Sequence, residues 1–255
     1  MVLRCGNYQL TLDRPLVMGI VNLTPDSFSG DGLANDTRRA VEHAYHQIEA
    51  GADLLDLGAE SSRPGALPTS LEDELKRLLP VLHELDGCGV PISVDTYKPE
   101  VMHAALGAGA SMINDIYALR MAGAAEVVSA SDCGVCLMHM QGEPLGMQQA
   151  PAYADVVGEV RDFLKARVQV AIAAGIAPDR LLLDPGFGFG KTLEHNLILL
   201  RHLEQSADAG FPLLVGMSRK SMLGAITGRP ADQRLPASIA VALLAAQQGA
   251  HILRV

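Results

Sequence analysis

The feature of this sequence that most restricts its fold is a regular recurrence of short apolar segments. Eight such segments, rich in Val, Ile and Leu, are each followed by a turn rich in Gly, Pro, Asp or Ser, and stretches of helical spacing lie between them. This repetition predicts strands that alternate with helices. The predicted strands are 17–21, 54–57, 91–94, 112–114, 135–138, 180–183, 213–215 and 251–255.

Eight strands joined by helices within 255 residues predict an α/β fold of the (β/α)8 TIM-barrel class, because such barrels need about 250 residues. No linker or shift in composition divides the chain, so we expect residues 1–255 to form a single domain. A doubly wound open sheet is the alternative. The even spacing of the strands, and the polar residues that follow each of them, favour the barrel.

Helix boundaries carry their own signals. Thr69 with Glu72 predicts a capping box, and Pro99 suits a first helical position. Gly175 followed by Pro178 predicts the end of a long helix.

Charge and hydropathy exclude several classes of partner. The formal net charge is −9 and the basic residues are scattered, which argues against nucleic acid. The longest uncharged stretch, 235–253, contains several polar side chains that a membrane span tolerates poorly. The N-terminal segment 1–14 is charged and has no apolar core of signal-peptide length. We therefore expect a cytoplasmic protein that binds neither nucleic acid nor membrane.

The four cysteines are too few and too unevenly spaced for a disulfide framework. Cys133 and Cys136 form a CxxC motif with His139 nearby, so a redox or zinc site is an alternative. Cys136 lies in an apolar run, which favours a buried thiol that packs as a small hydrophobe.

Polar side chains follow every predicted strand, and in barrels this end of the strands forms the active site. A single Asp after a strand is often only a helix cap, but the pattern here recurs at all eight strands. The residues are Asn22, Asp56, Asp95, Asn114, His139, Asp184, Ser218 to Ser221, and Arg254.

Carboxylates gathered at one mouth repel each other unless cations lie between them. Arg63, Arg219, Lys220 and Arg254 are the available cations. Arg219 and Lys220 stand where a helix should begin, and cations there oppose the helix dipole. A bound anion would compensate, and barrels often hold phosphate after strands seven and eight; the alternative is that they merely neutralise Asp184. We predict a flat, hydrogen-bonding ring ligand that carries phosphate or diphosphate.

The segment 184–192 ends in Gly-Lys-Thr, which suggests a P-loop. The spacing excludes it, because position 185, where the first glycine of that motif would stand, is Pro. The glycines that alternate with Phe187 and Phe189 allow tight turns and leave an aromatic ring free to face a planar ligand. We expect Phe189 to make that contact.

Several segments together resemble the dihydropteroate synthases, the pterin-binding enzymes of folate biosynthesis. The resemblance implies condensation of 6-hydroxymethyl-7,8-dihydropterin diphosphate with 4-aminobenzoate, giving 7,8-dihydropteroate and diphosphate. The matching segments are 19–29, 60–65, 93–96, 113–115, 137–140, 184–191, 216–221 and 252–255.

The resemblance also implies roles for individual residues. Acceptors and a donor would bind the pterin edge between apolar walls, in a pocket formed by Asp95, Asn114, Asp184, Lys220, Ile116, Met138 and Phe189. The catalytic residues implied are Lys220, Asp95, Asp184 and Arg254. Carboxylate and amide acceptors paired with a lysine donor suit the adjacent donor and acceptor groups of a pterin.

The same resemblance places Mg²⁺ on the diphosphate with the help of Asn22 and Asp26, an oxygen-ligand arrangement that magnesium prefers. The diphosphate oxygens would be held by Ser62, Arg63 and Arg254. The 4-aminobenzoate slot, where sulfonamides compete in this family, would be bordered by Phe28, Pro64, Lys220 and Ser221.

Two departures from the family are conservative: Ser62 stands for a common Thr, and Ala59 for a usual Gly. The family continues Arg-Val-His-Asp and adds a last helix, which the sequence through Val255 lacks. The family is typically a homodimer built through late helices, so we expect a homodimer. The alternatives are a pterin-dependent methyltransferase domain, which needs no magnesium loop, and a non-catalytic pterin-binding paralogue.

Overall fold

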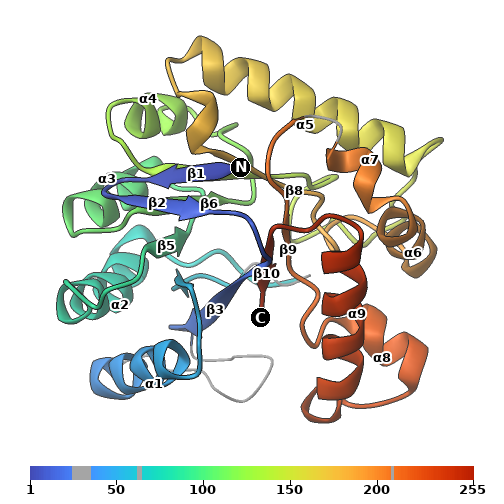
Figure 1. The fold of residues 1–255 in the computed structure, drawn as a ribbon, viewed down its shortest axis with the longest axis horizontal. Helices are drawn as coiled ribbons and strands as arrows, with labels where there is room; N and C mark the ends of the chain where they lie inside the picture. The colour runs from blue at the N-terminus through green and yellow to red at the C-terminus, as the bar shows by residue number, and fades with distance from the viewer. Residues whose placement is uncertain (25–35, 62–64, 208–209) are drawn as a thin grey trace.

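The computed structural model describes residues 1–24, 36–61, 65–207 and 210–255. Within them, eight parallel strands stand side by side and helices surround them (Figure 1). The strands are β3 Leu16–Asn22, β4 Leu54–Gly58, β5 Ile92–Asp95, β6 Met112–Asp115, β7 Gly134–Met138, β8 Leu181–Asp184, β9 Leu214–Val215 and β10 Ile252–Arg254. All eight predicted strands are present, and no boundary is shifted by more than one residue.

The sheet closes into a barrel. The strands pair in the order β8-β7-β6-β5-β4-β3-β10-β9. A further parallel bridge joins Leu183 of β8 to Leu213, and Leu183 N–H donates to Pro212 O at 3.0 Å. The described strands thus form the (β/α)8 TIM barrel that the repetition predicts, and an open doubly wound sheet is excluded.

Side chains alternate along each strand between the barrel interior and the helices. The interior changes in character from one end to the other. The N-terminal half is apolar and includes Met18, Leu54, Met112, Cys136, Leu182, Leu214 and Ile252. Two residues further along β4, β6, β8 and β10, the same face carries Asp56, Asn114, Asp184 and Arg254.

A hairpin that the sequence analysis missed covers the apolar end. Its strands are β1 Val2–Cys5 and β2 Tyr8–Thr11, which pair antiparallel. Leu3 and Cys5 are fully buried and belong to the same apolar cluster as the lower barrel interior. Figure 1 shows the hairpin lying across the strands, close to β6.

The helices follow the strands in chain order. They are α1 Thr37–Glu49, α2 Leu71–Glu84, α3 Pro99–Gly107, α4 Ala124–Ser129, α5 Val156–Ala173, α6 Leu193–Arg201, α7 Leu203–Ala207, α8 Ser221–Thr227 and α9 Leu235–Gln247, with short 3-10 turns at Pro178–Arg180 and Ala231–Gln233. No helix in the described part of the chain is long and apolar enough to cross a membrane.

The helix signals were mostly right. Pro99 begins α3 and the glycine at 175 follows the end of α5, as predicted. The capping box at Thr69 and Glu72 was wrong by one residue. Ser70 caps α2 and accepts from Asp73 N–H, because the helix begins at Leu71.

The CxxC motif is not a paired site. Strand alternation directs Cys136 into the barrel interior, whereas Cys133 belongs to the cluster between strands and helices. Burial raises the pKa of both thiols, so neither is poised as a thiolate. The described residues contain no group of three or more His, Cys, Asp or Glu side chains that could hold a metal.

Candidate active site

The carboxyl ends of the strands bring the predicted polar residues to one mouth. Asp95 is the last residue of β5, and the register pairs it directly with Asn114 on β6. Asp184 ends β8 and is paired with Met138 of β7. Arg254 lies on β10, beside Met18 of β3. The barrel topology, not proximity in sequence, therefore assembles the cluster.

Arg254 joins two carboxylates that lie on neighbouring strands of this mouth. Its Nε donates to Asp56 Oδ2 at 2.6 Å, and a terminal nitrogen donates to Asp95 Oδ2 at 2.9 Å. Asn114 Nδ2 also donates to Asp56 Oδ2, at 3.1 Å. Asp56 is fully buried; the sequence placed it among the polar residues at the strand ends but assigned it no individual role in the site.

Two buried oxygens in this cluster have no hydrogen-bond donor among the described residues. They are Oδ1 of Asp56 and Oδ1 of Asn114. Buried polar atoms in native proteins nearly always have partners. The mouth therefore presents acceptors that a ligand rich in N–H groups can satisfy.

Lys220 and Asp184 form a second polar pair on the other side of the mouth. Lys220 precedes α8, and its ammonium donates to the carbonyl of Phe187 and lies 4.9 Å from the centre of the Phe189 ring. Asp184 Oδ1 accepts from Gly186 N–H at 2.7 Å. The loop after β8 therefore holds both groups.

An apolar wall adjoins these groups. Ile116, Met138, Met140 and Met147 form a buried cluster, and Phe189 packs against it. The three predicted wall residues, Ile116, Met138 and Phe189, are thus brought together. Phe187 is fully buried, which leaves Phe189 as the partly exposed ring of the pair, as expected from the sequence.

Burial shifts the proton affinities of the cluster. It raises the pKa of Asp95 to about 7, against the attraction of Arg254. It lowers the pKa of Lys220 to about 8, while Asp184 acts in the opposite direction. Such shifted groups within one mouth are typical of functional sites.

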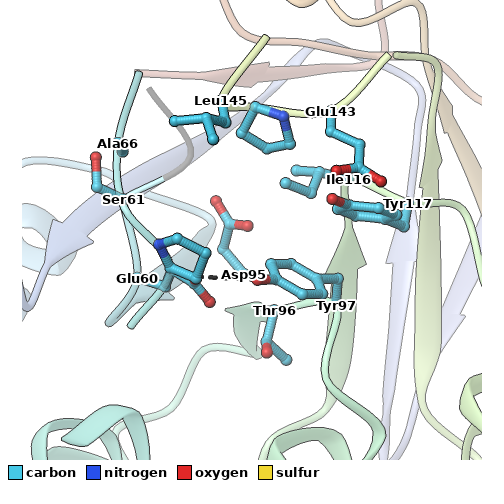
Figure 2. Close-up of a pocket in the computed structure, with 12 residues that line it drawn as sticks. Glu60, Ser61, Ala66, Asp95, Thr96, Tyr97, Ile116, Tyr117, Glu143 and Leu145 are labelled. Carbon is cyan, nitrogen blue, oxygen red and sulfur yellow. Dashed lines mark hydrogen bonds between the residues drawn. The ribbon is translucent and has the colours of Figure 1, made fainter. Parts of the chain in front are cut away.

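A cavity opens beside Asp95, between the ends of β5 and β6 and the loops after β4 and β7 (Figure 2). Tyr97 and Tyr117 line it with ring centres 4.7 Å apart, and Glu60 lies opposite them. Tyr97 Oη donates to Glu60 Oε1 at 3.0 Å. The two tyrosines were not predicted, although each stands two or three residues after a polar strand-end residue.

The remaining predicted residues are only partly described. Asn22 ends β3 on the face that Met18 shares, so its amide points toward the mouth. Ser221 is the exposed first residue of α8, next to Lys220. The structure does not describe Asp26, Phe28, Ser62, Arg63 or Pro64.

Comparisons with known proteins agree with this geometry. Residues 18–255 match the family described as pterin binding enzyme. The dihydropteroate synthase of Neisseria meningitidis serogroup C is 52% identical over 259 residues, which cover 100% of this chain and 92% of that protein.

Two solved structures are also similar. A Yersinia pestis dihydropteroate synthase in complex with a sulfonamide drug has a TM-score of 0.97 at 48% identity, covering 100% of this chain and 93% of that one. The Burkholderia cenocepacia enzyme complexed with 7,8-dihydropteroate has a TM-score of 0.91 at 49% identity, covering 99% and 90%. The chain therefore belongs to the pterin binding enzyme family and, within it, to the dihydropteroate synthases.

Proposed function

We propose that the acceptor cluster at the barrel mouth binds the pterin ring of 6-hydroxymethyl-7,8-dihydropterin diphosphate, which the enzyme joins to 4-aminobenzoate. The observation that carries this proposal is the pair of buried acceptor oxygens on Asp56 and Asn114 that lack a donor among the described residues. Asp56 and Asn114 lie on β4 and β6, the strands on either side of Asp95, and Arg254 contacts both Asp56 and Asp95.

In this pocket Asp95, Asn114 and Asp184 accept from the ring N–H groups and the exocyclic amine. Lys220 donates to a ring carbonyl or nitrogen, which its placement above Phe189 permits. Ile116, Met138 and Phe189 pack on the flat faces of the ring. With these contacts, every buried polar group of the ligand would have a hydrogen-bond partner.

Arg254 is the residue that would bind the diphosphate. Its guanidinium is held by two carboxylates in the structure described, and the oxygens of a diphosphate can accept from its remaining N–H groups. Ser62 and Arg63 would complete this anion site from the segment after β4.

Asn22 and Asp26 are proposed to help hold Mg²⁺ at the diphosphate. The amide oxygen of Asn22 is a hard donor at the end of β3, which fits magnesium. When bound, the ion would neutralise charge on the leaving group.

The reaction breaks the bond between the pterin methylene carbon and the diphosphate oxygen, and the electron pair leaves with diphosphate. The amine of 4-aminobenzoate then forms the new C–N bond and gives up a proton. Asp95 and Asp184 stabilise the positive charge that spreads into the ring, and Arg254 and Lys220 stabilise the departing anion. These four residues are the proposed catalytic group, while Phe28, Pro64, Lys220 and Ser221 would border 4-aminobenzoate.

The enzyme is further proposed to be a cytoplasmic homodimer whose residues 1–255 form one domain. The free thiols Cys5, Cys88, Cys133 and Cys136 suit a reducing compartment. Leu235, Ile239 and Leu243 repeat every four residues on α9 and are each more than half exposed, which suits burial against a second copy. Sedimentation of Ile239→Asp and of wild type tests this, because the variant should sediment as a monomer. If the variant is still a dimer, α9 does not form the interface.

The pocket assignment is tested with two variants and two ligands. Asp95→Asn should lose affinity for the pterin alcohol in calorimetry, because the amide mixes a donor into an acceptor pair. Arg254→Ala should weaken the pterin diphosphate more than the pterin alcohol. Unchanged binding in the first variant, or equal losses in the second, contradicts the respective role.

A further inference from the structure

Lys191 is a buried cation that the proposed function leaves without a role. It belongs to the Gly190-Lys191-Thr192 sequence in which a P-loop was considered and rejected. Only 3% of its surface is exposed. Its ammonium nitrogen lies inside the loop that joins β8 to α6.

The ammonium contacts uncharged groups on both sides of the loop. Nζ lies 2.9 Å from Gly186 O, 3.0 Å from Phe189 O and 2.9 Å from Nδ1 of His139. Burial, and secondarily the charge of Lys191, lower the pKa of His139 to about 2, so that imidazole is neutral and Nδ1 can accept. Lys191 therefore joins two carbonyls of its own loop to the end of β7.

The loop packs tightly against the segment after β7 at two of its glycines. A Cβ on Gly186 would lie 1.9 Å from His139 O, and a Cβ on Gly190 would lie 2.3 Å from Gln141 O. Both glycines also have positive φ, at +71° and +59°. The backbone packs directly on the segment after β7, and its inward carbonyls depend on the Lys191 donor.

The groups that this loop carries are those of the proposed pterin pocket. Gly186 N–H donates to Asp184, and the Phe187 carbonyl accepts from Lys220. The Phe189 ring lies against the Lys220 ammonium and the apolar wall. A change in the shape of the loop would displace an acceptor, a donor and a ring contact together.

The charged and titratable groups around Lys191 come from three neighbouring segments. Asp184 attracts its ammonium, Lys220 repels it, and burial lowers its pKa to about 7. Arg120, after β6, acts on His139 in the same direction as Lys191. A neutral lysine amine keeps two N–H groups, enough for the two loop carbonyls in either charge state.

We propose that Lys191 is a positioning residue of the synthase: its buried amine fixes the loop 185–191 so that Asp184, Lys220 and Phe189 meet the pterin ring. The inference rests on the proposed pterin pocket. Three groups held by this loop would contact the pterin, whereas only Lys220 would border 4-aminobenzoate, so a change at Lys191 should weaken pterin binding more than 4-aminobenzoate binding.

The direct test is Lys191→Met, which keeps the length of the side chain and removes its donors. Loss of two hydrogen bonds predicts that the calorimetric Kd for 6-hydroxymethyl-7,8-dihydropterin rises about tenfold. The KM for 4-aminobenzoate should change by less than about twofold. Lys165→Met, on the exposed face of α5, is the matched control and should leave both constants unchanged.

This split separates positioning from folding. A variant that merely unfolds more readily would lose active enzyme, which lowers the apparent kcat but leaves the pterin Kd of the folded fraction unchanged. An unchanged pterin Kd, or equal increases for both substrates, overturns the proposal.

A milder variant covers the case in which Lys191→Met does not fold. Tyr153 Oη donates to Gly190 O at 2.8 Å, so Tyr153→Phe loosens the same loop from outside. The pterin Kd should rise about threefold, with the 4-aminobenzoate KM constant. If both folded variants bind pterin as wild type does while Asp95→Asn loses affinity, the pocket stands and the role of Lys191 falls. If wild type itself does not bind pterin, the proposed pocket falls.

Discussion

The two halves of the barrel interior differ in chemistry although the same strands build them. The lower half, next to the N-terminal hairpin, is filled by apolar side chains such as Met18 and Leu54. The upper half holds Asp56, Asp95 and Arg254 in one ion-paired cluster. Leu54 and Asp56 lie on the same face of β4, only two residues apart.

The difference shows where stability and binding each come from. Burying apolar side chains stabilises the fold by about 2 to 3 kcal/mol for each large residue. In the upper half, burial raises the pKa of Asp95 and lowers that of Lys220, so the folded state disfavours the charge on both. The lower half stabilises the barrel, and the upper half holds the groups that are proposed to bind the ligands.

The sharpest way to break this comparison is Lys220→Met. Removing a donor that is proposed to stabilise the departing charge should lower kcat/KM by about 10²-fold or more. The midpoint of thermal unfolding should stay within a few degrees of wild type or rise, because a buried charge is removed. A large loss of stability with modest loss of activity would show that Lys220 is structural.

The reciprocal change is Met18→Ala in the lower half. A cavity in a fully buried layer should cost about 3 kcal/mol of unfolding free energy in urea. The kcat/KM per folded molecule should remain within about twofold, since the cavity lies below the ligand groups. Val170→Ala on the surface of α5 is the control and should cost less than about 0.5 kcal/mol. A loss of catalysis that matches the loss of stability would mean that the two halves are not separable.

A fall in pH should raise the free energy of unfolding and lower the affinity for pterin, both through protonation of Asp95. Its folded pKa of about 7 lies above its ordinary value of 3.8, so the charged form lowers the free energy of unfolding above pH 7. That loss of stability is reversed as the pH falls from about 7 toward 4. Pterin affinity should fall over the same interval, because a protonated carboxyl loses an acceptor.

The measurement is calorimetric pterin Kd, together with unfolding free energy, between pH 8 and pH 6. The difference between wild type and Asp95→Asn isolates this group from Asp115, whose pKa burial also raises, to about 6. Identical pH profiles for the two proteins would remove Asp95 from this role.

The smallest expected effect lies at the boundary between the halves. Cys136 packs in the apolar layer, and its pKa is raised mainly by burial and then by Asp184 and Asp56 above it. Cys136→Ala should cost about 1 kcal/mol in stability, because only one sulfur atom is removed. The pterin Kd should rise less than about twofold in calorimetry. A larger rise in the pterin Kd would show that the layer of Cys136 belongs to the polar half of the barrel interior, which binds the ligand, and not to the apolar half.

The sequence predicted the repeated features well and the single ones poorly. Eight strands followed by polar residues established the barrel and placed Asp95, Asn114, Asp184 and Lys220 at one mouth, because parallel strands end at the same edge. The hairpin at Val2–Thr11 was missed since its short strands occur once and have no repeating pattern.

Contacts between distant side chains were beyond the sequence for a different reason. The bridge from Arg254 to Asp56 joins residues 198 positions apart, and only the pairing of the last strand, β10, with β3 brings it within reach of β4. The partners of Lys191 likewise depend on the backbone path through three glycines of positive φ, which local propensity does not specify. For the segments around Asp26 and Arg63 the family resemblance remains the basis of assignment.

The N-terminal hairpin covers the end of the barrel opposite the polar mouth, where apolar side chains already fill the interior. Since Leu3 and Cys5 pack on this apolar layer, the proposed pocket leaves the mouth that the strand ends surround as the route for both substrates and both products. Substrates that enter and products that leave would therefore use the same opening. Dihydropteroate that has not yet left occupies the place of the next pterin, so the rate at which product departs sets an upper limit on turnover.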